Sequence, residues 1–162
     1  MVPKYLRVPL LKYYRIMLRI MRSSLIALVL LAATLSAAPK KVVQPKEFPG
    51  GRPFSAAILT GDTLYVSGNI GADLKTGKIP ERFEDEVKLC LENIGILLKA
   101  GGMDYKDVVS VQVYLTDMDQ FKEMNAVYLT FFKSEPRPTR TTVGVTKLAG
   151  GAHVEITVTA KK

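Results

Sequence analysis

Arg140 and Glu155 are the two residues of this sequence whose types and setting could do chemistry. Both charges stand among Thr, Val and Ile in the stretch 136–160, which reads PRPTRTTVGVTKLAGGAHVEITVTA. An arginine can hold a planar carboxylate through two parallel hydrogen bonds. A glutamate can accept a proton or orient a water molecule. The pair fits either a site that captures a small carboxylic acid or a cross-strand ion pair on a solvated sheet face.

Two strands of one hairpin are expected to position this pair. Segments 139–145 and 153–160 alternate apolar and polar residues and flank a Gly150-Gly151 break, a pattern typical of an antiparallel hairpin with a wide loop. The alternation places each charge on the less apolar face of its strand. We therefore expect the guanidinium and the carboxylate to lie on neighbouring strands.

The rest of the chain predicts an α+β domain. Apolar residues recur at helical spacing before the glycine pair at 101–102, and a second periodic stretch follows an alternating, strand-like segment. The order β-β-α-β-α-β-β favours a mixed β-sheet with two helices packed on one face. The expected strands before the hairpin are 54–59, 63–67 and 108–115, and the expected helices are 83–99 and 118–133.

Two further polar positions are candidates for a binding site. The second strand ends at Ser67-Gly68, where a small side chain beside glycine lets a ligand or another backbone approach closely. Asn125 falls on the apolar stripe of the second helix. An amide in that place is either a structural hydrogen-bonding group or a ligand contact, because buried polar groups need partners.

The sequence gives little support for a metal site, a phosphate-binding loop or a Ser-His-Asp catalytic triad. One histidine, His153, and one cysteine, Cys90, are too few soft ligands for zinc. The segment 71–78 has one residue too many between its glycines for a phosphate loop, and Ile79 stands where Ser or Thr would bind magnesium. His153 is better explained as a half-exposed strand residue, and Cys90 as a small core residue. No metal is expected.

The net charge of +8 is concentrated at the start of the 162 residues. Residues 1–38 contain 6 of the 23 basic side chains and no acid, so 23 − 6 = 17 basic and 15 acidic side chains remain, or +2. Nucleic-acid binding is therefore not expected. The basic start and the uncharged run 23–38 are typical of an export signal with Ser36-x-Ala38 as its cleavage pattern, which Pro39 would hinder.

These features predict a three-part chain. Residues 1–38 are a signal peptide or, if uncleaved, a membrane-tethering leader, because the apolar run is shorter than the ~20 residues that span a bilayer comfortably. Residues 39–50, rich in Pro and Lys, are a linker, and residues 51–162 are the domain. The protein is expected to be exported, either periplasmic or secreted, and to meet a membrane only through its leader.

Three segments together resemble the reactive intermediate/imine deaminase family, RidA, also called YjgF. They are Ser67–Ile70 (SGNI), the stretch 111–132 (VQVYLTDMDQFKEMNAVYLTFF), and Pro138-Thr139-Arg140 followed by Val154-Glu155-Ile156. The resemblance covers residues 50–160 in the right order. It implies a chorismate-mutase-like (bacillus-type) α+β fold, a homotrimer and ligand sites in the clefts between subunits.

The same resemblance implies an activity. Members of the family hydrolyse 2-imino acids and their enamine tautomers, such as 2-aminoacrylate, to 2-oxo acids and ammonia without a metal or organic cofactor. By this resemblance Arg140 clamps the substrate carboxylate and Glu155 positions the attacking water. Ser67 and Asn125 line the same pocket, and Gly68 keeps its wall close to the ligand.

Two residues depart from the family pattern. Phe54 stands where the best-characterised imine deaminases have a tyrosine, and Thr142 stands where they often have a cysteine. Both leave the carboxylate clamp in place, yet they could shift substrate preference or leave a non-catalytic trimeric protein that binds 2-oxo acids. Ribonuclease activity, claimed for some relatives, would lack a histidine pair, a metal cluster and a basic mature surface. Export is a third departure, since most relatives are cytosolic.

Overall fold

The chain divides into two units, Met1–Ala38 and Pro39–Lys162, and the computed structural model describes residues 13–21 and 38–162. Residues 13–21 form a helix in the first unit. Within the described residues, no helix has both the length and the apolar character that a bilayer crossing requires. The apolar run 23–38 lies outside the described residues except for Ala38, so the leader and the export that it implies stay predictions.

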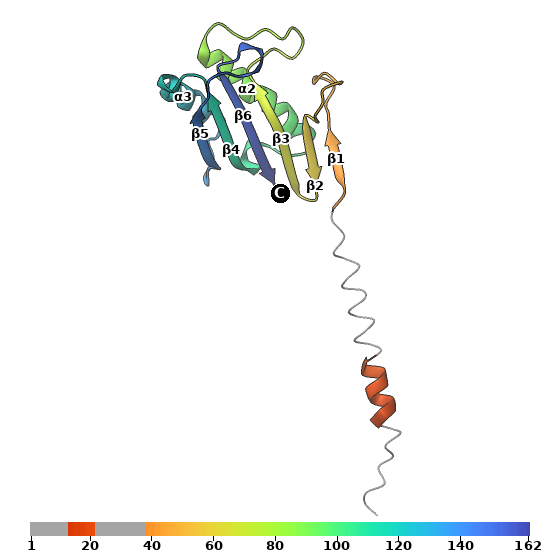
Figure 1. Ribbon diagram of the computed structural model, residues 1–162. Coiled ribbons are helices and arrows are strands. Elements are labelled where there is room, and N and C mark those ends of the chain that lie inside the picture. Colours follow the sequence, from red (N-terminus) through yellow and green to blue (C-terminus); the bar gives the residue numbers. More distant parts are fainter. Residues whose placement is uncertain (1–12, 22–37) are drawn as a thin grey trace, which may run out of the picture. The chain divides into compact units, whose positions relative to one another are not determined.

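The second unit is organised around a six-stranded mixed sheet with the order β1-β2-β3-β6-β4-β5 (Figure 1). All neighbouring strands pair antiparallel except β4 and β5, which run parallel. The strands are β1 (Lys40–Val43), β2 (Ala57–Thr60), β3 (Thr63–Ile70), β4 (Val108–Leu115), β5 (Thr139–Gly144) and β6 (Val154–Lys161).

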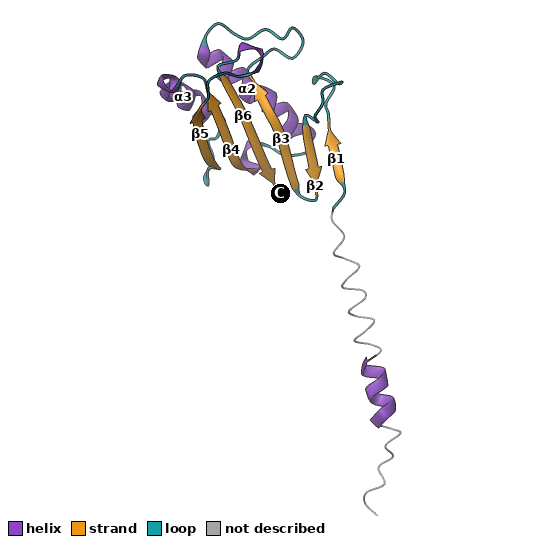
Figure 2. Cartoon of the chain, in the orientation of Figure 1, coloured by secondary structure: helices purple, strands orange, loops and turns teal. Residues whose placement is uncertain are grey.

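Two helices, α2 (Phe83–Ala100) and α3 (Phe121–Phe131), cover one face of this sheet (Figure 2). Because β3 and β4 are both antiparallel to β6, they run parallel to each other, and α2 connects them. The helix α3 connects β4 to the parallel β5. Crossovers between parallel strands are almost always right-handed, and two that step in the same direction place their helices on the same face. The predicted architecture is confirmed.

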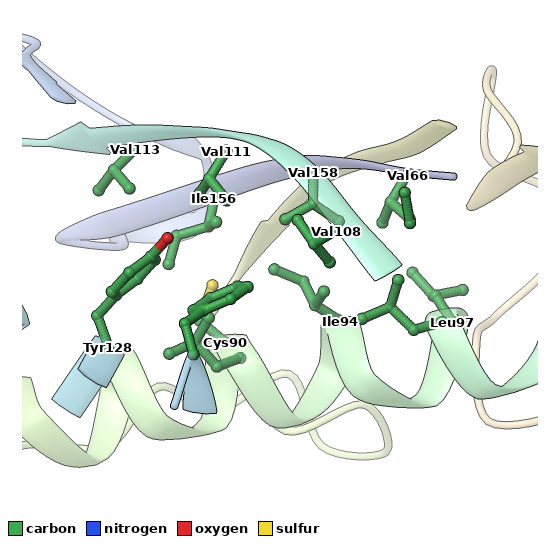
Figure 3. Packing of buried hydrophobic residues seen from close by; sticks show 14 of the residues in the cluster. Val66, Cys90, Ile94, Leu97, Val108, Val111, Val113, Tyr128, Ile156 and Val158 are labelled. Carbon is green, nitrogen blue, oxygen red and sulfur yellow. The ribbon is translucent and has the colours of Figure 1, made fainter. Parts of the chain in front are cut away.

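The core lies between α2 and the covered face of the sheet (Figure 3). Residues at helical spacing on α2 point at strand residues that alternate between buried and exposed, which is the periodicity expected of each element. Cys90 belongs to this core, and its thiol donates to the carbonyl of Asn69 at 3.0 Å. Burial raises the pKa of the Cys90 thiol, so the group stays protonated and its interpretation as a core residue is confirmed.

The predicted hairpin of segments 139–145 and 153–160 is wrong. The two strands exist, but β5 lies at the edge of the sheet and β6 lies between β3 and β4. Their burial explains the placement, because β6 buries every second residue from Val154 to Ala160 whereas β5 has no fully buried residue. The strand β6 therefore has a neighbour on each side, whereas β5 has only β4. The Gly150-Gly151 segment connects β5 to β6, but these two strands do not pair with each other.

The other boundaries are mostly close to expectation. The strand over 108–115 is confirmed and the first helix ends one residue later than expected. The second helix starts with a 3-10 turn, Met118–Gln120, before α3. The predicted linker is wrong in part, because residues 40–43 form β1 and both Val43 and Phe48 are buried in the core. The Pro- and Lys-rich composition of this segment gave no indication that Val43 and Phe48 pack in the core.

Candidate active site

Arg140 on β5 lies over two aromatic rings of α3. Its Cζ atom is 4.5 Å from the ring centroid of Tyr128 and 5.7 Å from that of Phe121. A guanidinium above an aromatic face is attracted by about 0.5–2 kcal/mol. Arg140 is half-buried and makes no ion pair with any acid in the described part of the chain. The aromatic rings therefore hold the charge while leaving it without a carboxylate partner.

Two polar side chains share the surroundings of Arg140. Asn125 lies on α3 between Phe121 and Tyr128 at helical spacing, so it shares their face. Its side chain has no hydrogen bond to any described residue. Thr142 lies two residues after Arg140 and so on the same face of β5, and its buried Oγ1 has no hydrogen-bond partner in the described chain. Unpartnered polar atoms beside a guanidinium are features of a ligand site.

Tyr128 supports this arrangement as a neutral ring. Burial raises the pKa of its hydroxyl, and the positive charge of Arg140 opposes that rise. The phenol therefore stays protonated near neutral pH, so it presents a ring face to the cation and carries no charge that would occupy the guanidinium. We call Phe121, Asn125, Tyr128, Arg140 and Thr142 the guanidinium half-site.

Glu155 on β6 lies on the opposite, uncovered face of the sheet, where it pairs in register with Ile70 and Tyr114. Its carboxylate lies against Gly68 of β3. A Cβ atom at Gly68 would collide with Oε1 of Glu155 and come within 2.8 Å of Cδ. The group that approaches Gly68 closely is therefore the Glu155 side chain, and not the backbone or ligand expected from the sequence.

Ser67 and Gly68 lie in a β-bulge beside Glu155. The register of β3 with β6 shifts between Val66 and Asn69, which leaves these two residues outside the regular ladder. The backbone N–H and the Oγ of Ser67 both donate to the carbonyl of Ala56 at 3.0 Å. Asn69 Nδ2 donates to the carbonyl of Ser67 at 2.7 Å. The bulge is thus held on both sides by hydrogen bonds.

Phe54 lies in the bend before β2, outside the strand predicted for it. The residue is 52% exposed, and Cζ of Arg52 lies 5.8 Å from the centroid of its ring. Ala56, two residues later, is the residue that accepts both hydrogen bonds from Ser67. Phe54 therefore lies just before the segment that carries the bulge, and we call Ser67, Gly68 and Glu155 the carboxylate half-site.

The expectation that Arg140 and Glu155 lie on neighbouring strands is wrong. The strand β4 separates them, with Val111 paired to Arg140 and Tyr114 paired to Glu155. Positions 111 and 114 are an odd number of residues apart, so the two charges face opposite sides of the sheet. Two strand spacings and three residues of rise separate their Cα atoms by roughly 14 Å. One chain therefore cannot bring the two groups into one site.

Sequence reasoning missed the aromatic support of Arg140. Helical spacing places Phe121 and Tyr128 on the apolar inner stripe of the second helix, which predicts only that they pack in the core, and Tyr128 is indeed buried. Phe121 is half-buried, and both rings face the guanidinium as well as the core. The signal that could have found them is the presence of Asn125 between two aromatic residues on one helix face.

Comparisons with known proteins agree with this fold. A family model described as Endoribonuclease L-PSP matches residues 46–162. The RutC family protein of Aquifex aeolicus is 36% identical over 124 residues, which cover 76% of this chain and 99% of that protein. The human protein named 2-iminobutanoate/2-iminopropanoate deaminase is 35% identical over 128 residues, which cover 78% of this chain and 93% of that protein.

A solved structure extends the agreement to three dimensions. The crystal structure of RidA from an Antarctic Psychrobacter species superposes with a TM-score of 0.71 at 33% identity, over 75% of this chain and 99% of that one. The segments that resemble RidA lie within the matched region. The chain therefore belongs to the Endoribonuclease L-PSP family, the RidA/YjgF family, and has its chorismate-mutase-like α+β fold.

Proposed function

We propose that this chain is a hydrolytic deaminase that converts reactive 2-imino acids and their enamine tautomers, such as 2-aminoacrylate, to 2-oxo acids and ammonia. The observation that carries the proposal is the guanidinium half-site, where Arg140 lies over two rings with no acidic partner in the described chain, near the unpartnered Oγ1 of Thr142. A small carboxylate would satisfy both groups. The relatives named 2-iminobutanoate/2-iminopropanoate deaminase support the reaction.

The complete site, in this proposal, forms between two copies of the chain in a homotrimer. The two half-sites face opposite sides of one sheet, so a second copy must supply the missing half. The uncovered face also exposes large apolar side chains that a partner would bury. These are Val42, Tyr65, Val109 and Val143. Residues 42, 58, 65 and 159 form one continuous row across four strands of that face.

In the proposed reaction, the guanidinium half-site and the carboxylate half-site have different roles. Arg140 of one copy binds the substrate carboxylate, and Glu155 of a second copy orients a water molecule toward the imine carbon. The water oxygen adds to that carbon and its proton passes through Glu155 to the nitrogen, which gives a tetrahedral adduct with a hydroxyl and an amino group. The hydroxyl proton then passes to the nitrogen as the C–N bond breaks, so that ammonia leaves and the 2-oxo acid forms. The imine carbon is already electrophilic, so positioning supplies much of the catalysis. A charge-assisted bond from Arg140 contributes roughly 1.5–3 kcal/mol, or about ten- to a hundredfold in rate if it is expressed in the transition state.

The direct test is ammonia release from freshly generated 2-aminoacrylate. We expect the purified protein to accelerate the release and Arg140→Ala to abolish the acceleration. Arg137→Ala is the matched control, because Arg137 is a nearby arginine that pairs with Glu135 at 2.9 Å on the exposed surface. Equal rates for the wild type and Arg140→Ala would contradict the proposal.

A non-catalytic protein that binds 2-oxo acids is the second candidate. It is favoured by Phe54, whose exposed ring brings no hydroxyl to the carboxylate half-site, and by Thr142 in place of a cysteine. This candidate predicts that 2-oxo acids raise the melting temperature while a panel of imino acids shows no turnover. Turnover of any imino acid that depends on Arg140 would exclude it.

We also propose that the protein is exported, on the basis of the basic start and the uncharged run 23–38. The mature protein would then be found in the periplasmic or secreted fraction, or at the membrane if the leader stays attached. Intact mass measurement of the protein recovered from each fraction tests this. A full-length chain confined to the cytosolic fraction would contradict it.

A further inference from the structure

Glu86 of α2 is a fully buried carboxylate that plays no part in either half-site. Its side chain is 0% exposed. Burying a carboxylate is costly unless hydrogen bonds and charges compensate for the lost water. Close packing at Gly71 also fixes its position, because a Cβ atom there would collide with the carbonyl oxygen of Glu86 and lie 2.5 Å from its Cγ. The buried side chain of Glu86 is therefore held in one position by its neighbours.

Three donors satisfy the two oxygens of Glu86, and all of them lie at the start of β6. Oε1 accepts from the backbone N–H of His153 at 2.7 Å and from that of Val154 at 3.2 Å. Oε2 lies 2.8 Å from Nδ1 of His153, whose side chain is half-exposed. The helix α2 therefore holds the first residues of β6 through one side chain, across 67 positions of sequence.

The strand needs such an anchor at this point. The segment before it is the 3-10 turn Ala149–Gly151, in which Gly150 and Gly151 have positive φ angles and no side chains to pack. The carbonyl of His153 accepts from the N–H of Thr116 at 3.0 Å. The peptide groups of His153 are thus held from both sides, by Glu86 and by the end of β4, two residues before Glu155.

We propose that Glu86 is a positioning residue for Glu155, which it keeps against Gly68 by fixing the start of β6. This inference rests on the proposed function, in which Glu155 orients the attacking water. The guanidinium half-site is carried by β5 and α3, which Glu86 does not contact through any hydrogen bond in the described chain. Loss of the anchor should therefore disturb the reaction step and spare substrate binding.

The decisive comparison is Glu86→Met against Glu86→Gln in the full assembled protein. Methionine keeps the volume but leaves the N–H groups of His153 and Val154 without an acceptor, whereas glutamine keeps an acceptor oxygen for both. A shift of about 1 Å in a catalytic group can cost up to about a hundredfold in rate. We expect Glu86→Met to lower kcat at least about tenfold with KM within about twofold, and Glu86→Gln to stay within about threefold of wild type.

Tyr105→Phe is the control for a general loosening of α2. The hydroxyl of Tyr105 donates to the carbonyl of Leu91 at 2.7 Å, so its removal costs α2 a hydrogen bond that has no link to β6. We expect kcat of this variant to stay near wild type. A fall in kcat equal to that of Glu86→Met, or a rise in KM as the main effect of Glu86→Met, would overturn the proposal.

A second pair keeps the inference testable if Glu86→Met does not fold. His153→Ala removes the donor to Oε2, and His153→Gln restores one from an amide. We expect faster amide hydrogen exchange at residues 153–155 and a lower kcat in His153→Ala, with both largely recovered in His153→Gln. Unchanged exchange and kcat in His153→Ala would overturn the proposal.

A structural readout separates this inference from the proposed function. If the wild type turns over no imino acid, the proposed function fails by itself. The anchor is then judged by amide exchange at residues 153–155 and by a crystal structure of Glu86→Met, in which we expect the Glu155 carboxylate to leave Gly68. Retention of that contact with unchanged exchange would overturn the positioning role.

Discussion

The two half-sites differ in how the chain holds them. The guanidinium half-site is built on β5, an edge strand without a fully buried residue, and Arg140 is held there by the ring faces of α3. The carboxylate half-site is built on β3 and β6 inside the sheet, where hydrogen bonds hold the bulge at Ser67 and the start of β6. In the proposed site, the group that captures the ligand therefore lies on an edge strand, whereas the group that orients the water molecule lies on a strand paired on both sides.

Exchanging the charged group in each half should separate binding from turnover. We expect Glu155→Gln to lower kcat by about a hundredfold or more, because a general base is lost, while the affinity for a 2-oxo acid is largely kept. Arg140→Ala should instead abolish 2-oxo acid binding. Isothermal titration calorimetry with pyruvate, beside steady-state rates, checks both. Loss of 2-oxo acid binding in Glu155→Gln, or its retention in Arg140→Ala, would contradict this division between binding and turnover.

Mixing the two inactive variants tests whether the halves come from different copies. In randomly mixed assemblies of Arg140→Ala and Glu155→Gln chains, about a quarter of the inter-copy sites combine an intact Arg140 with an intact Glu155. We expect activity to return from background to about that fraction of wild type after co-refolding. The double variant mixed with wild type is the control. Activity that stays at background in well-mixed assemblies would place both halves of the site in one chain.

The aromatic support of Arg140 should have a smaller effect. Phe121→Leu removes one ring beneath the guanidinium and keeps an apolar side chain, so we expect KM to rise about two- to fivefold, which matches a cation–π contribution of about 0.5–1 kcal/mol. Leu129→Ala is the matched control, because Leu129 is an exposed residue of the same helix. If both variants have the KM of wild type, the ring does not support the guanidinium.

Thr142→Val should change stability and affinity in opposite directions. Its Oγ1 is buried without a partner, so replacing the hydroxyl by a methyl group of the same shape should raise the melting temperature by a few degrees. The same change should weaken 2-oxo acid binding a few fold, because the ligand loses a donor. A thermal melt and a titration measure the two effects, and a lower melting temperature would show that the hydroxyl already has a partner.

Local sequence patterns were sufficient to predict the helices and strands, but not which strands pair with each other. Helical periodicity located α2, and alternation located β4, because each signal resides in consecutive residues. The pairing of β5 and β6 depends on which neighbour offers more buried surface, and that neighbour, β4, lies more than twenty residues upstream in the sequence. The hairpin was therefore predicted from a glycine break that only joins the strands.

The residues of the candidate site could be predicted from the sequence, but their positions relative to one another could not. Arg140, Glu155, Gly68 and Thr142 could be named from their types and from the family resemblance. That Arg140 and Glu155 face opposite sides of the sheet follows from their registers with Val111 and Tyr114, which no local pattern contains. The role of Glu86 was also hidden, because an acidic residue in the first turn of a helix is ordinarily explained by the helix dipole.

The strand β1 limits where the leader could be removed under the proposed export. Lys40–Val43 pairs with β2 from the first to the last residue, and Val43 is 6% exposed. A protease that cuts at or before Pro39 leaves this outermost strand in place. A cut after Val43 would strip the backbone partner from β2 and leave an open edge on which other chains can aggregate. The sheet itself therefore constrains where the proposed cleavage of the leader could occur.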